Sequence, residues 1–159
     1  MTSINKKQKG FTVIELLIVI IAVGILGAIV ISTYSGIKVK ENNSTRQSDI
    51  KDIQTQLEAF YSQNGYYPSL NDINNPAWRL KNMPNLKTSD LIDPTAKDRS
   101  PADAKLAPLP APGVFAYQVT DSNGNSCESN VTSCAKYTLT ATFQGKVNGQ
   151  ATYVKKNLD

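Results

Sequence analysis

A single carboxylate interrupts the most apolar part of the sequence. Glu15 precedes residues 16–37, a run of 22 residues without a charged side chain, and it follows Phe11 in a largely apolar stretch. An ionised side chain within a membrane helix costs about 2 to 3 kcal/mol or more, whereas the cost is small at the headgroup boundary. Glu15 is therefore either a residue at the membrane boundary or a carboxylate that meets a cation in an apolar environment.

The apolar run after Glu15 is long enough to cross a membrane. A helix of 22 residues spans roughly 33 Å, which matches the hydrocarbon core of a bilayer. Lys6, Lys7 and Lys9 precede the run, and positive charge stays on the cytoplasmic side. The run is too long for a secretory signal peptide, and no small-residue cleavage site ends it. We therefore expect one membrane helix, with the N-terminus in the cytoplasm and the C-terminal part outside.

The residues around Glu15 resemble the leader and first helix of the type IV pilin family, the prepilins and their secretion-system relatives, the pseudopilins. The match is KGFTVIELLIVI at residues 9–20: a short basic leader ending in Gly10, then Phe11, then Glu15 as the fifth residue after the glycine, then an apolar run. A looser match is QLEAFYSQNGYYP at residues 56–68, where helices of this family often end.

The resemblance implies a processing step and an assembly step. A membrane-embedded prepilin peptidase would cut between Gly10 and Phe11 and methylate the new N-terminus at Phe11, and Glu15 would pair with the terminal ammonium of a neighbouring subunit. It also implies a platform membrane protein, a cytoplasmic ATPase and further copies of the chain as partners. The leading interpretation is a structural subunit of an extracellular type IV pilus that serves adhesion, motility or DNA uptake.

Small residues recur every four positions along the apolar run, at Gly24, Ala28, Ser32 and Gly36. Close approach of two backbones through such a face drives helix association in lipid, although membrane helices are generally rich in Gly and Ala. The stripe is thus either a helix-packing face or a chance pattern. Many pilins have a proline where this chain has Ser32, and their helix unwinds locally in this region. Whether the helix of this chain also unwinds there stays open.

The remainder of the chain predicts an α+β, pilin-like fold. We divide the chain into a leader at 1–10, a membrane and filament-core helix at 11–37, an amphipathic helix at 38–64, a proline-rich loop region at 65–113 and an antiparallel sheet at 114–159. Residues 42–45 are poor helix formers and could make a flexible joint. All eight prolines lie within the loop region, where we expect mainly loop and a short helix near residues 89–92. Three strands are expected at 114–120, 136–143 and 150–154, with the amphipathic helix covering their apolar face.

The only two cysteines, Cys127 and Cys134, predict a disulfide, because an outward-facing domain meets an oxidising environment. Its correspondence with the cysteine-closed surface loop of pilins stays open. The spacing of Asp121, Asn123, Asn125 and Glu128 resembles the start of a calcium loop, but a polar turn explains it better because later positions of the pattern do not match. With no histidine and no phosphate-binding motif, we expect no metal, no cofactor and no enzymatic activity.

The net charge of +4 belongs mainly to the leader. The leader contains three of the 17 basic residues and none of the 13 acidic ones, so the remaining side chains carry a net charge of +1. A nucleic-acid partner is therefore not indicated. Two alternatives to a pilus subunit stay open: a pseudopilin of a type II secretion system, and an uncleaved single-span anchor for an extracellular binding domain, which would retain residues 1–10.

Overall fold

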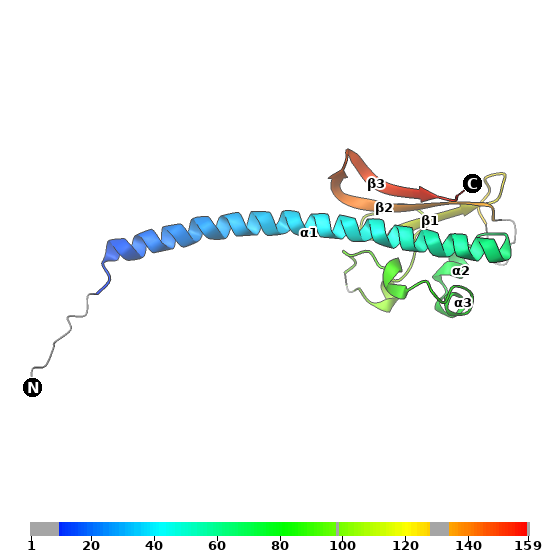
Figure 1. Cartoon of the computed structure of the whole chain (residues 1–159), viewed down its shortest axis with the longest axis horizontal. Helices are drawn as coiled ribbons and strands as arrows, with labels where there is room; N and C mark the ends of the chain where they lie inside the picture. Colours follow the sequence, from blue (N-terminus) through cyan, green and yellow to red (C-terminus); the bar gives the residue numbers. More distant parts are fainter. Residues whose placement is uncertain (1–9, 98, 128–133, 159) are drawn as a thin grey trace, which may run out of the picture. The chain divides into compact units, whose positions relative to one another are not determined.

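The structure is a computed structural model that describes residues 10–97, 99–127 and 134–158. It consists of two compact units, Met1–Lys38 and Val39–Asp159, which are treated separately below (Figure 1). The long helix α1, Val13–Asn64, supplies the helical residues of the first unit and continues into the second. We call the second unit the head.

Helix α1 is unbroken across residues 42–45, so the expected flexible joint is wrong. Asn42 and Asn43 are weak helix formers, but both side chains are buried in the head and hydrogen-bonded to Gln144. Tertiary hydrogen bonds thus outweigh the low intrinsic propensity. The helix ends at Asn64, and Gly65 follows with φ +76°, the left-handed conformation that commonly closes a helix.

Three antiparallel strands form the sheet in the order β1, β2, β3. They are β1 Phe115–Thr120, β2 Lys136–Val147 and β3 Gln150–Lys156. The strand β2 is longer than expected. Gly145 (φ +76°) accommodates a register shift between β2 and β3, so pairing continues beyond it. The turn between the two strands consists of Asn148 and Gly149 alone, which both have positive φ. The predicted α+β, pilin-like class is confirmed, with α1 packed on a three-stranded antiparallel sheet.

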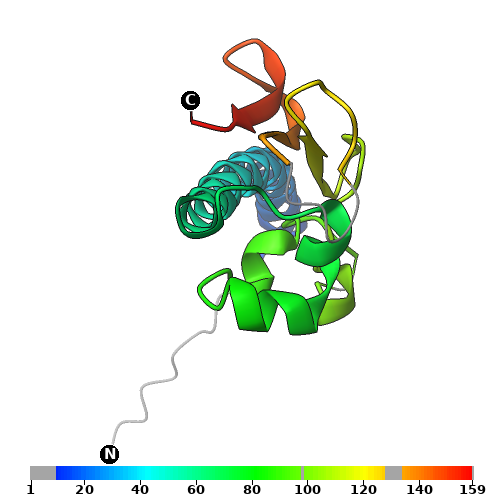
Figure 2. The same cartoon turned by 90° about the vertical axis from the view of Figure 1, so that its right-hand side faces the viewer.

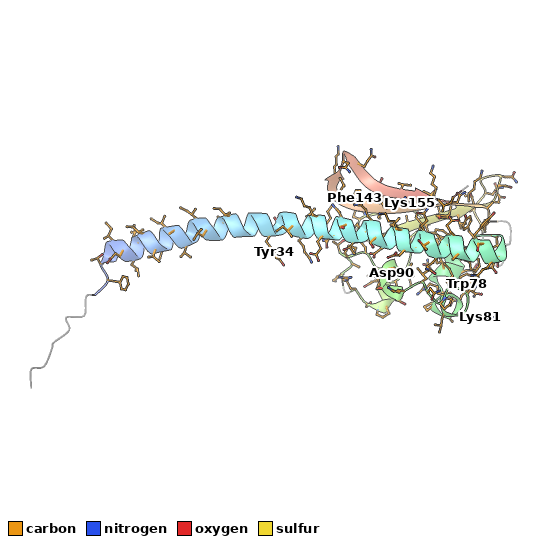
Figure 3. All side chains as sticks on the ribbon, viewed as in Figure 1. Tyr34, Trp78, Lys81, Asp90, Phe143 and Lys155 are labelled. Atoms are coloured by element: carbon orange, nitrogen blue, oxygen red, sulfur yellow. A yellow bond between two sulfur atoms is a disulfide. The ribbon has the colours of Figure 1, made fainter. Side chains whose placement is uncertain are left out.

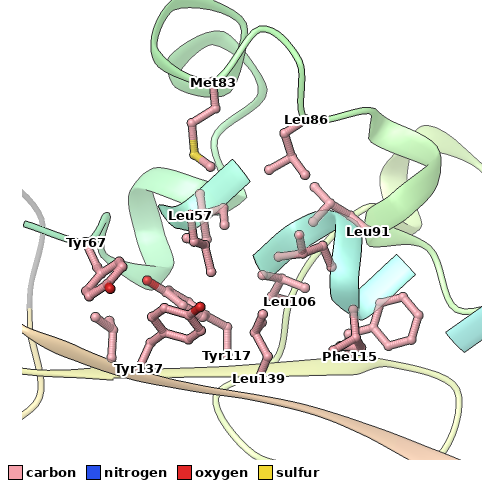
Figure 4. Close-up of a cluster of buried hydrophobic side chains, with 14 of the residues drawn as sticks. Leu57, Tyr67, Met83, Leu86, Leu91, Leu106, Phe115, Tyr117, Tyr137 and Leu139 are labelled. Carbon is pink, nitrogen blue, oxygen red and sulfur yellow. The ribbon is translucent and has the colours of Figure 1, made fainter. Parts of the chain in front are cut away.

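Within the head, α1 lies between the sheet and short helices from the proline-rich region (Figures 1 and 2). Its buried residues Ile50, Ile53 and Leu57 contribute to a core shared with both sides (Figure 4). The sheet side of this core includes Phe115, Tyr117, Val119, Tyr137, Leu139 and Ala141, and the other side includes Ile73, Met83, Leu86, Leu91 and Ile92.

The proline-rich region contains more helix than the sequence predicted. The short helix expected near residues 89–92 is the 3₁₀ helix η1, Thr88–Leu91. The additional elements are α2 Leu70–Asn74, α3 Pro76–Asn82 and the 3₁₀ helix η2 Pro101–Asp103. Ser69 and Asn75 cap α2 and α3, and Pro76 occupies the first turn of α3, where its missing N–H is not needed. The ring of Trp78 lies 5.4 Å from that of Phe60, which packs α3 onto α1.

Glu58 fastens α1 to the C-terminal half of the head. Its carboxylate accepts hydrogen bonds from the hydroxyls of Tyr67 (3.0 Å) and Tyr137 (2.6 Å) and from the backbone N–H of Leu158 (3.2 Å). Burial, together with the neighbouring Glu58 carboxylate, raises the pKa of Tyr137, so its hydroxyl remains a donor. One helix residue therefore joins the segment after α1, strand β2 and the end of the chain.

The two edges of the sheet are different. The outer edge of β1 is covered where Ala107 exchanges backbone hydrogen bonds with Phe115 and Tyr117. The other edge is β3, which carries Lys155 and Lys156 at its end. The ammonium of Lys155 lies 5.8 Å from the centre of the Tyr153 ring.

Candidate processing and assembly site

The peptide bond expected to be cut lies in exposed, non-helical chain. Gly10, Phe11 and Thr12 precede the first helical residue, Val13, and all three are exposed. The Phe11 side chain is 87% exposed. Residues 1–9 of the expected leader lie outside the described part of the chain. The Gly10–Phe11 bond is thus accessible in this unit.

Glu15 and Thr12 form a reciprocal cap at the start of α1. The Glu15 Oε2 atom accepts from the backbone N–H and the hydroxyl of Thr12, both at 2.8 Å. The backbone N–H of Glu15 donates in return to Thr12 Oγ1 at 3.3 Å. This is the capping-box geometry, which satisfies two N–H groups that have no acceptor within the helix. Among the described residues, the other carboxylate oxygen, Oε1, has no hydrogen-bond partner.

The site predicted from the sequence comprises Gly10, Phe11 and Glu15 and does not include Thr12. The signal was present, because Thr-x-x-Glu immediately before an apolar run is the sequence signature of a capping box. Thr12 therefore joins Glu15 as a residue of the candidate site, on the basis of the hydrogen bonds between them.

The first unit exposes an apolar surface. The large apolar side chains of α1 from Val13 to Ile29 are each at least half exposed, and Tyr34 also projects from the helix (Figure 3). Helix α1 is long and apolar enough to cross a membrane, by length and composition. An exposed apolar surface of this extent requires lipid or another apolar helix to cover it.

The small-residue stripe lies on exposed helix. A Cβ atom added at Gly24 or Gly36 would meet nothing within 4 Å, and Ala28 is also exposed. The side chain of Ser32 lies outside the described residues. The geometry leaves room for a second helix at these glycines, and the packing role stays a prediction.

Cys127 and Cys134 are joined in a disulfide, with their Cα atoms 5.8 Å apart. The bond closes the connection between β1 and β2. The carbonyl of Cys134 accepts a hydrogen bond from the backbone N–H of Tyr67 at 2.9 Å, so the bridge is also attached to the segment after α1.

The residues of the weak calcium pattern form a polar turn before this disulfide. Asp121 Oδ1 accepts from the backbone N–H groups of Asn123 (2.9 Å) and Asn125 (2.8 Å), and Oδ2 accepts from the Asn125 side chain (3.0 Å). These hydrogen bonds, foremost that of the Asn125 side chain, lower the pKa of Asp121. Glu128 lies outside the described residues.

The N-terminal region matches a known family. The model of the prokaryotic N-terminal methylation motif matches residues 5–31, which include Gly10, Phe11 and Glu15. In this region the chain is similar to prepilins. The curated relatives of the chain include both branches that the sequence suggested.

Three relatives illustrate the similarity. The type II secretion system core protein G of Escherichia coli K12 is 34% identical over 65 residues, which are 41% of this chain and 45% of that protein. The core protein G of Pectobacterium carotovorum is 28% identical over 104 residues, 65% and 60% of the two chains. The type IV major pilin protein PilA of Myxococcus xanthus is 33% identical over 63 residues, 40% and 29%.

The similarity thus covers part of each protein. The chain spans less than two thirds of the length of these relatives. No solved structure matches the chain significantly.

Proposed function

We propose that this protein is a prepilin, that is, a structural subunit of a filament and a substrate of the prepilin peptidase. It is cleaved between Gly10 and Phe11, methylated at Phe11 and polymerised through the N-terminal part of α1. The observation that carries the proposal is Glu15, which stands in the first turn of an exposed apolar helix with one carboxylate oxygen unoccupied. Such a carboxylate needs a cationic partner if the helix is to be buried among other helices.

Cleavage supplies that partner. Hydrolysis of the Gly10–Phe11 bond creates an α-ammonium on Phe11, and an ammonium and a carboxylate each reduce the cost of desolvating the other. Glu15 Oε2 remains on Thr12, while Oε1 accepts from the ammonium of a neighbouring subunit. Because the pair forms only at one axial offset between helices, it also selects the register, as a buried polar group does in a coiled coil.

The proposed setting follows from the exposed surface of α1. The precursor lies in the cytoplasmic membrane with its N-terminus inside, and the head faces outward. Assembly exchanges lipid for neighbouring helices, with Gly24, Ala28, Ser32 and Gly36 at the helix contacts. The platform protein and the ATPase are partners implied by the family resemblance, and nucleic acid is not an expected partner.

The N-terminus of the mature protein tests this proposal. We expect mass spectrometry of protein from the native host to find a chain that begins with N-methylated Phe11. A peptidase-deficient strain should retain residues 1–10 and serves as the control. A chain that keeps residues 1–10 in the wild-type strain would support the uncleaved-anchor alternative and contradict the proposal.

The kind of filament has two candidates. The Cys127–Cys134 loop favours a pilus subunit, since pilins often carry a cysteine-closed loop. The similarity to type II secretion core protein G over as much as 65% of the chain favours a pseudopilin at least as strongly. Deletion of the gene separates them: loss of surface filaments in electron micrographs indicates a pilus, and intact filaments with loss of secreted proteins indicate a pseudopilin.

A further inference from the structure

Helix α1 is attached to the head by two chemically different seams. From Ile50 onward its buried side chains are apolar: Ile50, Ile53, Leu57 and Phe60. Between residues 39 and 49 its buried side chains are all polar: Asn42, Asn43 and Arg46. We call residues 39–49 the polar seam and residues 50–60 the apolar seam.

The polar seam is centred on a buried ion pair. The Arg46 guanidinium is 1% exposed and binds the Asp93 carboxylate in a bidentate manner, with Nε–Oδ2 at 2.7 Å and Nη2–Oδ1 at 2.8 Å. Burial would raise the pKa of Asp93, but hydrogen bonds from Arg46 and Thr95 outweigh it and lower the pKa. Arg46 also donates to Asn43 Oδ1 (2.9 Å) and Thr95 Oγ1 (2.9 Å). The loop at residues 93–95 is thus attached to α1 by charge and hydrogen bonds.

Asn43 extends the polar seam to strand β2. Its side-chain amide donates to the backbone carbonyl of Gln144 (3.1 Å) and accepts from the backbone N–H of Gln144 (2.9 Å). Asn42 donates to the Gln144 side chain at 2.8 Å. Gln144 lies within the stretch where β2 shifts register against β3, so a helix side chain takes the place of a strand neighbour at this residue.

The two seams differ in what their opening exposes. Opening the apolar seam would expose buried hydrocarbon to water, which is unfavourable. Opening the polar seam exchanges protein hydrogen bonds for hydrogen bonds to water and rehydrates both charges, so the net loss for each hydrogen bond is modest. Local opening concentrates where buried apolar contacts are few.

We infer that the polar seam is a latch: residues 39–49 detach from the loop at 93–95 and from Gln144 while the apolar seam stays packed. Opening separates residues 39–49 from the rest of the head without unfolding the core. The Asn43 amide closes the latch, because it hydrogen-bonds both to Arg46 and to the backbone of Gln144.

Hydrogen exchange with mass spectrometry tests the latch on the purified full chain in detergent micelles. A detached helix segment keeps its intrahelical hydrogen bonds but loses the tertiary contacts that hold it folded, so these bonds break more often. We therefore expect backbone amides at 42–49 to open at least about 10-fold more often than those at 53–60. Asn43→Ala should increase exchange at 42–49, near Asp93 and near Gln144 by a further ~10-fold and leave 53–60 unchanged. Ser48→Ala, on the exposed side of the same segment, is the matched control and should change nothing.

The alternative is that the head opens as one cooperative unit. Equal exchange of 42–49 and 53–60 in the wild type, or an equal increase of both in Asn43→Ala, would overturn the latch. Leu57→Ala should raise exchange in both seams and shows what global destabilisation looks like. If Asn43→Ala does not fold, Asn42→Ala replaces it, because this change removes the hydrogen bond to the Gln144 side chain. Exchange at 42–49 is then compared with exchange at 53–60 in the same way.

Discussion

At Glu15, one carboxylate has two separable tasks: capping α1 through Oε2 and, as proposed, pairing with an ammonium. Glu15→Ala removes both, so we expect a chain that is inserted and cleaved but forms no filaments. Glu15→Gln keeps an oxygen for the Thr12 N–H and loses the charge. Electron microscopy of both variants checks the prediction. Filaments of normal length from Glu15→Gln would show that the cap, rather than the charge, is the function of Glu15.

Asp49 is a second carboxyl group in an unfavourable place. Burial, then the charge of Asp90 and that of Asp52, raise the pKa of Asp49 to about 7, against the effect of Arg99. The unfolded chain releases this proton near pH 3.9. The folded state therefore binds more protons between about pH 4 and 7, and the stability of the head falls as pH rises through this window.

Asn in place of Asp49 removes this dependence. We expect Asp49→Asn to be more stable than the wild type by about 1 kcal/mol at pH 8, less than the full pKa shift implies because Asp49 is only half-buried. Urea unfolding of the full chain at pH 4 and pH 8 measures it. Ser62→Ala, at an exposed position on the same helix and without a titratable group, is the control. If the free energy of unfolding of Asp49→Asn differs from that of the wild type by the same amount at both pH values, the prediction is wrong.

Among the elements, the connection between β1 and β2 depends on a covalent bond. The Cys127–Cys134 disulfide closes a short loop, with a sequence separation of 7. Loop-closure entropy predicts a loss of about 2 to 3 kcal/mol in unfolding free energy when both cysteines are replaced by serine. Urea unfolding of the double variant checks this, and reductant should lower the wild type to the same value. An equal free energy of unfolding before and after reduction would show that the disulfide does not stabilise the head.

The sequence predicts a helix or strand well where a residue pattern extends along its whole length. The uncharged run at 16–37 and the alternating strands each carry a pattern along their whole length, and the structure has those elements. The prolines of residues 65–113 predict loop, whereas Pro76 at the start of α3 is a helix initiator. The absence of a joint at Asn42 and Asn43 could not be predicted, because their partner Gln144 is about 100 residues away in the sequence.

For the whole molecule, the division into two units predicts separable behaviour. The exposed apolar side chains lie chiefly in residues 11–37, and the core lies in the head. We expect a fragment of residues 39–159 to be a folded, soluble monomer without detergent. Size-exclusion chromatography with light scattering and circular dichroism test this, with the full chain in detergent as reference. A fragment that aggregates or lacks sheet signal would show that the head needs residues 1–38 to fold.

The edge strand β3 could pair with the same strand of a neighbouring subunit in a filament. A filament would hold many copies of the head at a high local concentration, where an unpaired strand edge can template amyloid-like sheets between neighbours. We expect Lys155 and Lys156 to oppose this, because a parallel, in-register copy of β3 would place each lysine beside the same lysine of its neighbour. Like charges so close would disfavour sheet pairing between the heads.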